Sequence, residues 1–150
     1  MCAPYAPKQR GHDMTEQQKQ AVRESWSQVV PIADKAAELF YTRLFQLDPS
    51  LRHLFKGDMA EQGRKLTMTL NLAVKSLDRL DQLTPVLQDL GRRHVGYGVK
   101  DSHYAAVGAA LLWTLEQGLG EAFTGEVHDA WAATYGLVSG VMMDAAAAAA

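Results

Sequence analysis

The spacing of the apolar residues limits what this chain can fold into more than any other feature of its sequence. Between residues 15 and 144, apolar side chains recur three and four positions apart, as they do on one face of an α-helix. Val127, Trp131, Tyr135, Val138 and Met142 form one such series. No run of alternating apolar and polar residues lies between hairpin turns. The sequence therefore predicts an all-α fold of about seven helices.

Capping residues mark several of the expected helix ends. Thr15 followed by Gln18 resembles a capping box, which predicts the start of the first helix. Thr84-Pro85 is expected to open a short helix, because proline is tolerated in the first helical turn, and Gly96 is expected to end it. No long linker separates the predicted helices, which indicates a single domain.

The composition fits one globular domain. The chain of 150 residues is long enough for one sizeable core, and 47% of its residues are hydrophobic. The net charge of -2, with acidic and basic residues mixed along the chain, favours neither nucleic acid nor an acidic membrane as a partner. We expect a flexible leader at 1–14, the folded domain at 15–144 and an alanine-rich tail at 145–150.

Cysteine content and apolar run length indicate a cytoplasmic protein. Cys2 is the only cysteine, so an intrachain disulfide is impossible. The first fourteen residues lack the hydrophobic segment of a secretory signal. No stretch of about 18 or more apolar residues is present to span a membrane.

The sequence contains none of the common signatures of hydrolases, kinases or zinc proteins. It has no HExxH or CxxC motif and no second histidine at metal-ligand spacing. A glycine-rich phosphate loop would need a preceding strand, and none is predicted. Cys2 and the serines have no recognisable base beside them. Conventional hydrolase or kinase chemistry is therefore not expected.

One of the five histidines differs from the others in its surroundings. The five are His12, His53, His94, His103 and His128. His94 continues the apolar stripe of its predicted helix, whereas the other four are expected in the leader, at the surface or near helix starts. On spacing alone, a lone histidine on an apolar face is more often an ordinary core residue than a ligand.

Several segments taken in order resemble the globin family. The resemblance covers residues 15–144 and is nearest to bacterial single-domain globins and the haem domain of flavohaemoglobins. The segments are Phe40-Tyr41-Thr42-Arg43-Leu44-Phe45, Asp48-Pro49-Ser50-Leu51-Arg52-His53-Leu54-Phe55, Gln62-Gly63-Arg64-Lys65-Leu66 and Leu90-Gly91-Arg92-Arg93-His94, followed by Tyr104, Trp131 and Tyr135-Gly136. The resemblance implies a globin fold packed around one haem b (iron protoporphyrin IX).

The resemblance also implies how the haem is held. His94 takes the place of the proximal histidine that ligates the iron, which leaves the sixth coordination position open. Phe55 takes the place of a phenylalanine that packs on the porphyrin, a role compatible with core packing. The further cofactor-binding positions are Leu66, Leu90, Arg93 and Tyr104. Arg93 fits a pairing with a haem propionate or an ordinary solvated position.

On the opposite side of the haem, the family's pocket positions fall on Tyr41, Gln62 and Leu66. Gln62 and Leu66 are four residues apart, so one helix face presents both. From the residues alone, Tyr41 could be core filler and Gln62 solvated. With the resemblance, the Tyr41 hydroxyl and the Gln62 amide become donors to a bound gas, each hydrogen bond to a charged group being worth about 1.5–3 kcal/mol. Glutamine in place of histidine implies five-coordinate iron, since no distal histidine is there to close the sixth position, although Tyr41 or Gln62 could approach the iron in the ligand-free state.

One feature of flavohaemoglobins is missing. They place a glutamate late in the last helix, where it bonds the proximal imidazole. The corresponding stretch here, Met142-Met143-Asp144-Ala145-Ala146, has no glutamate, and Asp144 is out of register. Peroxidase-like chemistry is therefore not implied.

Three functions within the family remain open. The first is reversible binding of O2, with CO and NO as further ligands. The second is nitric oxide dioxygenation, carried by Tyr41 and Gln62 and sustained by a separate reductase. The third is gas sensing through a partner. Outside these, a helical interaction module without haem is the alternative, although it leaves His94 and Phe55 unexplained.

Overall fold

The structure is a computed structural model that describes residues 14–149, and in this range the chain is entirely helical. It confirms the predicted all-α class, with six α-helices and three 3-10 segments in place of the expected seven helices or so. The elements are α1 (Glu16–Val29), η2 (Val30–Ile32), α2 (Ala33–Leu47), η3 (Pro49–Leu54), α3 (Met59–Lys75), α4 (Leu80–Gly96), α5 (Asp101–Leu119), η4 (Gly120–Ala122) and α6 (Gly125–Ala149).

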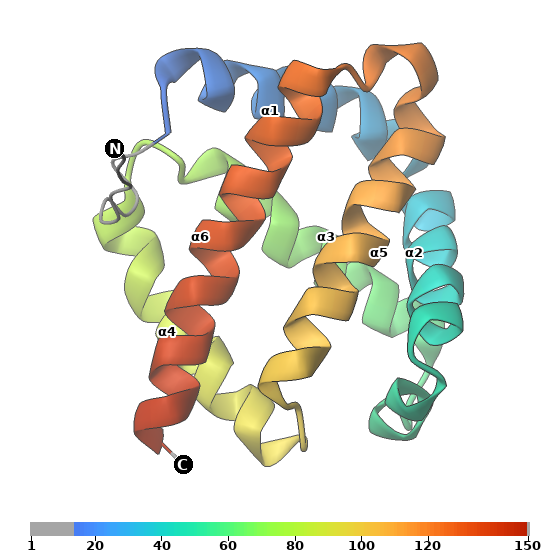
Figure 1. Ribbon diagram of the computed structural model, residues 1–150, viewed down its shortest axis with the longest axis vertical. Helices are drawn as coiled ribbons and strands as arrows, with labels where there is room; N and C mark the ends of the chain where they lie inside the picture. Colours follow the sequence, from blue (N-terminus) through green and yellow to red (C-terminus); the bar gives the residue numbers. More distant parts are fainter. Residues whose placement is uncertain (1–13, 150) are drawn as a thin grey trace, which may run out of the picture.

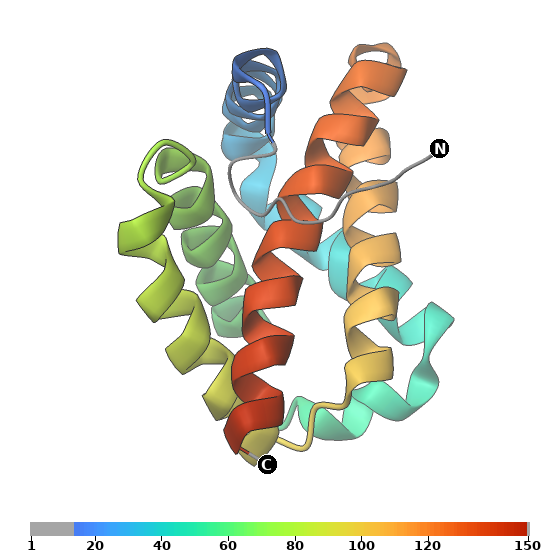
Figure 2. The same ribbon diagram turned by 60° about the vertical axis from the view of Figure 1, so that its left-hand side comes forward.

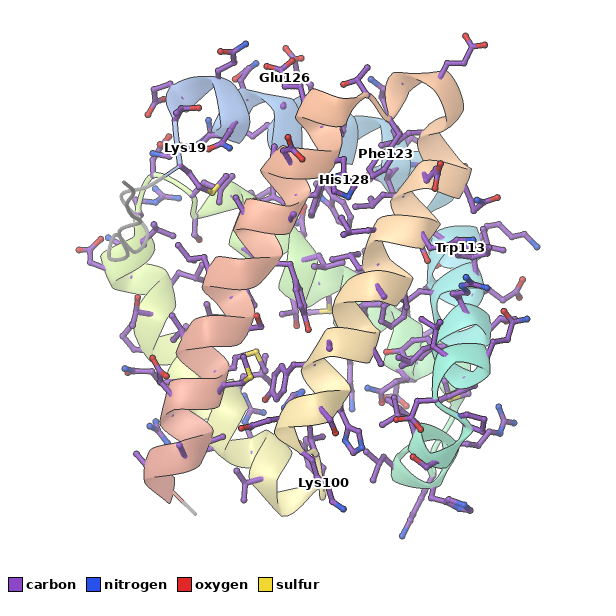
Figure 3. The ribbon with its side chains drawn as sticks, in the orientation of Figure 1. Lys19, Lys100, Trp113, Phe123, Glu126 and His128 are labelled. Atoms are coloured by element: carbon purple, nitrogen blue, oxygen red, sulfur yellow. The ribbon has the colours of Figure 1, made fainter. Side chains whose placement is uncertain are left out.

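The helices form two groups that meet in the middle of the molecule. α6 packs against α4 and α1, while α5 packs against α2 (Figure 1). α3 crosses behind α5 and α6 in Figure 1, is seen to the left of α6 in Figure 2, and packs against α2 and α1. Where α2 meets α5, the guanidinium carbon of Arg43 lies 5.1 Å from the ring centroid of Trp113 (Figure 3). The helices around α5 and those around α4 therefore supply opposite walls of the interior.

The buried apolar side chains divide into two clusters. The larger lies among α1, α2, α3, α5 and the first half of α6, and includes Val22, Leu44 and Trp131. The smaller is centred on α4, the start of α5 and the second half of α6, and includes Leu87 and Met142. A main core with a smaller cluster beside it is common in a single domain. Here the smaller cluster is the one that includes residues of α4.

The sequence signal at the start of α1 is confirmed. The Gln18 backbone N–H donates to Thr15 Oγ1 at 3.0 Å, and the Thr15 N–H donates to Gln18 Oε1 at 3.0 Å. This reciprocal pair satisfies two of the N–H groups that a helix start leaves unbonded.

The predicted start of α4 is wrong. Thr84-Pro85 does not open a short helix, because α4 begins at Leu80 and Pro85 lies inside it. Pro85 lies beyond the first turn of α4 and removes one hydrogen bond from within the helix, at a cost of about 3 kcal/mol. The Leu83 and Leu87 side chains are 2% and 1% exposed, and their burial supports the longer helix.

The ends of the predicted domain lie at the limits of the described residues. Residues 1–13, which include Cys2 and His12, lie outside them. Met14, which we assigned to the leader, is buried, and its Sδ lies 3.7 Å from Thr134 Oγ1 on α6. The alanine-rich stretch continues α6 as far as Ala149. The limits of the domain remain a prediction.

The last two long helices, α5 and α6, are apolar over most of their length. α5 ends at Gly120, whose φ of 56° lies in the left-handed region that glycine adopts readily. Within residues 14–149, no helix combines the length and apolar character needed to cross a membrane.

Two buried indole groups join α1 to the rest of the molecule. The Trp131 N–H donates to Ser25 Oγ at 2.8 Å, and both residues are buried. The Trp26 N–H donates to Asn71 Oδ1 on α3 at 3.0 Å. The two rings lie 5.9 Å apart between centroids. α1 is thus fixed to α6 and α3 by hydrogen bonds that ordinary apolar packing does not provide.

We expect Ser25→Ala to lower the free energy of unfolding by about 1–3 kcal/mol, because it leaves the buried Trp131 N–H without an acceptor. Urea unfolding followed by circular dichroism measures the change. Ser27→Ala is the matched control, since Ser27 is exposed on the same helix. Equal effects of the two substitutions would contradict the role assigned to the buried hydrogen bond.

Candidate functional site

His94 lies in the last full turn of α4, and a hydrogen bond to its own helix fixes its ring. Its Nδ1 lies 2.8 Å from the carbonyl oxygen of Leu90. A carbonyl only accepts hydrogen bonds, so Nδ1 carries a proton and donates it. In the neutral imidazole, Nε2 then carries the lone pair, which is the arrangement that a metal ligand requires.

The surroundings of His94 favour this neutral form. Burial lowers the pKa of His94, and the nearby positive charge of Arg93 lowers it further, while the bond to Leu90 acts in the opposite direction. Arg93 is exposed, and its Nε lies 3.1 Å from Asp89 Oδ2. Arg93 therefore contributes a nearby charge while its side chain remains in solvent.

Tyr104, on the first turn of α5, presents a buried polar group beside His94. The two rings are stacked, with centroids 6.4 Å apart and planes inclined by 27°. The Tyr104 hydroxyl is buried and has no hydrogen-bond partner among the described residues. Burial raises the pKa of Tyr104, and the charge of Asp101 raises it further, so the phenol stays protonated. An unpaired donor of this kind costs free energy unless something else satisfies it.

A second tyrosine holds Tyr104 in place. The Tyr135 hydroxyl on α6 donates to the Tyr104 carbonyl oxygen at 2.6 Å. The Tyr135 ring lies against Gly108, where a Cβ atom would come within 2.8 Å of it. α5 and α6 thus fix the position of Tyr104 through its backbone and leave its phenol facing the site.

Across the interior, Tyr41 lies in an aromatic group on α2 and the following turn. Its ring centroid is 5.3 Å from that of Phe55 and 6.2 Å from that of Phe45. Burial raises the pKa of Tyr41 to about 12, while a hydrogen bond with the Gln62 side chain opposes the rise. Tyr41 therefore remains a neutral donor at physiological pH, with Gln62 within its reach.

The crossing of α2 and α3 explains why Tyr41 and Gln62 meet. Asp58 caps α3, accepting the Ala60 N–H at 2.9 Å, so Gln62 lies in the first turn of this helix. A Cβ on the next residue, Gly63, would come within 2.9 Å of the Ala37 Cβ on α2. The two helices therefore approach each other closely at Ala37, one helical turn before Tyr41.

A small apolar cavity lies beyond Leu66, among α1, α2, α3 and α5. Its volume is about 30 Å³, and Leu66, Phe40 and Leu111 are among the residues that line it. The two threonines in its wall donate to carbonyl groups of their own helices, Thr67 to Gly63 and Thr114 to Ala110. Leu66 thus lies in the wall of an apolar cavity, four residues along α3 from Gln62.

The candidate residues lie on the two sides of the divided core. Tyr41, Phe55 and Leu66 belong to or pack on the larger cluster, and Leu90 and Tyr104 belong to or pack on the smaller one. Leu66, Leu90, Phe55 and His94 are only half-buried. These features suit a flat apolar group that carries a metal. The two clusters offer apolar walls, His94 offers Nε2 as a ligand, and the Tyr104 phenol is buried without a partner among the described residues. The residues present therefore fit haem.

The other three histidines in the part of the chain that the structure describes take no part in this arrangement. The His103 Nδ1 accepts the backbone N–H of Lys100 at 3.0 Å, at the lower edge of the molecule (Figure 3). His128 is exposed, with Nδ1 3.0 Å from Asp129 Oδ1, and His53 is exposed on η3. Among residues 14–149, no three His, Cys, Asp or Glu side chains are grouped so as to hold a metal by themselves.

Sequence reasoning missed three residues of the site. Phe45 packs on Phe55 with centroids 5.6 Å apart, Tyr97 lies 5.6 Å from the His94 ring, and Tyr135 holds Tyr104. Two of these aromatic residues lie within the segments that resemble the globin family, and this was the available signal.

Comparison with known proteins agrees with this geometry. The sequence profile of the globin family matches residues 38–142. Neuroglobin of Danio rerio is 33% identical over 86% of this chain and 90% of its own length. A flavohemoprotein of Bordetella bronchiseptica is 36% identical over 69% of this chain, which spans only 27% of that relative. The relatives thus include animal globins as well as the flavohaemoproteins that the motifs indicated.

The fold has a counterpart among solved structures. The crystal structure of a hexacoordinated heme protein from an anhydrobiotic tardigrade, at pH 4, superimposes with a TM-score of 0.83. The match covers 90% of this chain and 96% of the other at 18% identity, so it establishes the likeness of fold alone. With the family profile covering most of the chain and a relative above 30% identity along nearly its full length, the protein belongs to the globin family.

Proposed function

We propose that the protein binds haem b between its two apolar clusters and reversibly binds O2, with CO and NO as further ligands. The observation that carries this proposal is the fixed tautomer of His94, which leaves a lone pair on Nε2 of a half-buried side chain stacked beside Tyr104. When bound, haem supplies an iron centre with a coordination position for a diatomic gas.

Side chains of the two apolar clusters would contact both faces of the haem. Phe55 and Leu66 would contact it on the side of Tyr41, and Leu90 and Tyr104 on the side of His94. These side chains are apolar or carry a protonated phenol, so they exclude water without adding charge. Arg93 is exposed and would pair with a haem propionate in place of Asp89. The free energy lost with the Asp89 ion pair would be small, because surface ion pairs are weak.

The Tyr41 and Gln62 side chains would stabilise a polar gas ligand by donating hydrogen bonds. Tyr41 keeps its proton because burial holds its pKa at about 12. The Gln62 amide retains an N–H at any physiological pH. Neither group is a strong ligand for haem iron, and we therefore propose five-coordinate iron in the gas-free state.

The first test is the visible absorption spectrum of the purified protein. We expect a Soret band that shifts on reduction and again with O2 or CO, together with a five-coordinate ferrous form. His94→Ala should remove or alter this band, whereas His128→Ala should leave it unchanged because His128 is exposed on α6. No Soret band even after hemin addition would contradict the proposal and leave a haem-free interaction module as the function.

The second test addresses the pocket donors. Tyr41→Phe removes one hydrogen bond to the gas ligand, and a bond worth about 1.5–3 kcal/mol corresponds to roughly 10- to 150-fold in an equilibrium constant. We expect O2 dissociation, measured by stopped-flow displacement with CO, to become at least several-fold faster. Thr42→Val is the control, since it removes an exposed hydroxyl one residue along the same helix. An unchanged O2 dissociation rate in Tyr41→Phe would remove Tyr41 from the pocket.

A second candidate function is nitric oxide dioxygenation. Two observations favour it: the Tyr41–Gln62 pair, and the similarity to a protein named flavohemoprotein. The overall reaction combines O2, NO and one electron to give nitrate, so a separate reductase must supply the electron. Tyr41 and Gln62 would hold the O2 in place during the reaction.

The test of this activity is nitrate formation from NO by the O2-loaded protein. With a generic flavoprotein reductase and NAD(P)H supplied, sustained nitrate production above one equivalent per haem is expected. Tyr41→Phe should reduce the yield, because faster O2 loss competes with the reaction. A yield limited to one equivalent, despite demonstrated reduction of the haem, would favour gas binding over catalysis.

A further inference from the structure

α4 and α6 touch through their backbones at one point, where Gly91 faces Met142. A Cβ atom at Gly91 would overlap the Met142 carbonyl oxygen and lie within 2.8 Å of its Cα and 2.9 Å of its carbonyl carbon. These are backbone atoms of a continuous helix, so they cannot rotate away as the end of a side chain can. Only a residue without a side chain fits here.

The contact is local to Gly91. Gly96 lies in the same helix, and a Cβ there would meet nothing within 4 Å. Gly91 is buried, whereas Gly96 is exposed. The two glycines therefore differ in their surroundings, although they belong to one helix, with Gly91 in its interior and Gly96 at its last residue.

Gly91 is also the last buried residue of α4 before His94. Leu83 and Leu87 hold the earlier turns of the helix in the smaller apolar cluster. Beyond Gly91, His94 is half-buried and the other residues as far as Gly96 are exposed. Apart from the Tyr97 and Tyr104 rings beside His94, the final turn of α4 thus extends from the Gly91–Met142 contact as an exposed segment.

The group that orients His94 is adjacent to this contact. Leu90, whose carbonyl accepts the imidazole N–H at 2.8 Å, is the residue before Gly91. Separating α4 from α6 to the usual 3.5–4.0 Å between carbon atoms requires a movement of about 1 Å. Such a movement displaces Leu90 and His94 together.

We propose that the Gly91–Met142 backbone contact positions His94 and thereby sets the strength of its bond to the haem iron. This inference rests on the proposed haem-binding function. Gly91 is a positioning residue that acts through His94, and Met142 contributes its main chain. Glycine at position 91 thus serves two purposes: it lets α4 and α6 pack closely, and it keeps His94 in position to bind the iron.

The test compares Gly91→Ala with Gly96→Ala in the haem-loaded protein. Resonance Raman spectroscopy of the ferrous, gas-free form measures the stretching frequency of the bond between iron and His94. We expect this frequency to shift in Gly91→Ala and not in Gly96→Ala. Haem loss to an excess of apomyoglobin should be about tenfold faster in Gly91→Ala, a typical effect of disturbing a group that orients a metal ligand.

A second pair of variants separates positioning from a general effect on the pocket. In His94→Gly, free imidazole can replace the side chain as ligand without a link to α4. Adding Gly91→Ala in this background should leave the iron–imidazole frequency unchanged. A shift that persists with free imidazole would overturn the proposal, because it would show that Gly91 acts independently of His94.

The remaining outcomes are equally distinct. Alanine is about 1 kcal/mol better than glycine within a helix, so loss of helical circular dichroism in the Gly91→Ala apoprotein could not come from helix propensity. Loss of the helical signal would overturn the proposal, because it would show that the Gly91–Met142 contact is needed for folding and not for the position of His94. Unchanged frequency and haem loss in Gly91→Ala would also overturn it. Failure of the parent protein to bind haem would instead refute the proposed function.

Discussion

The packing of α4 against α6 is the constraint on which the candidate site depends. α4 carries His94. Among the helices of residues 14–149, α6 is the one against which α4 packs along its length. Leu83 and Leu87 anchor its early turns, and Gly91 brings the two backbones together. The opposite wall, built from α2 and α3, is held by a separate close approach at Ala37 and Gly63. Each of the two walls is thus held by a close contact of its own between helices.

Burial has a common effect on the titratable groups of the site. It raises the pKa values of Tyr41 and Tyr104 and lowers that of His94, because an apolar environment disfavours the charged form of each. All three side chains are therefore neutral at physiological pH. The site presents two phenol donors and one imidazole lone pair without net charge, which suits an apolar cofactor and an uncharged gas.

Local sequence signals predicted local structure well. The Thr15 and Gln18 side chains form the expected capping box, and Asp48 caps the turn at Pro49 by accepting the Ser50 N–H at 3.1 Å. The prediction failed at Thr84-Pro85, where a proline that normally starts a helix lies inside one. The burial of side chains such as Leu83 outweighs the single hydrogen bond lost, and burial depends on neighbours that helix signals do not include.

The sequence by itself determined the all-α class, the order of the helices and the residues that share a helix face, such as Gln62 with Leu66 and Leu90 with His94. These follow from hydrogen bonds and spacings within a few residues. Only the tertiary structure decided that the core is divided, that the Tyr104 hydroxyl lacks a partner, and that Gly91 touches Met142 while Gly96 touches nothing. The reason is physical: burial and close contact are distances between segments far apart in the chain, and these are set by how the helices pack.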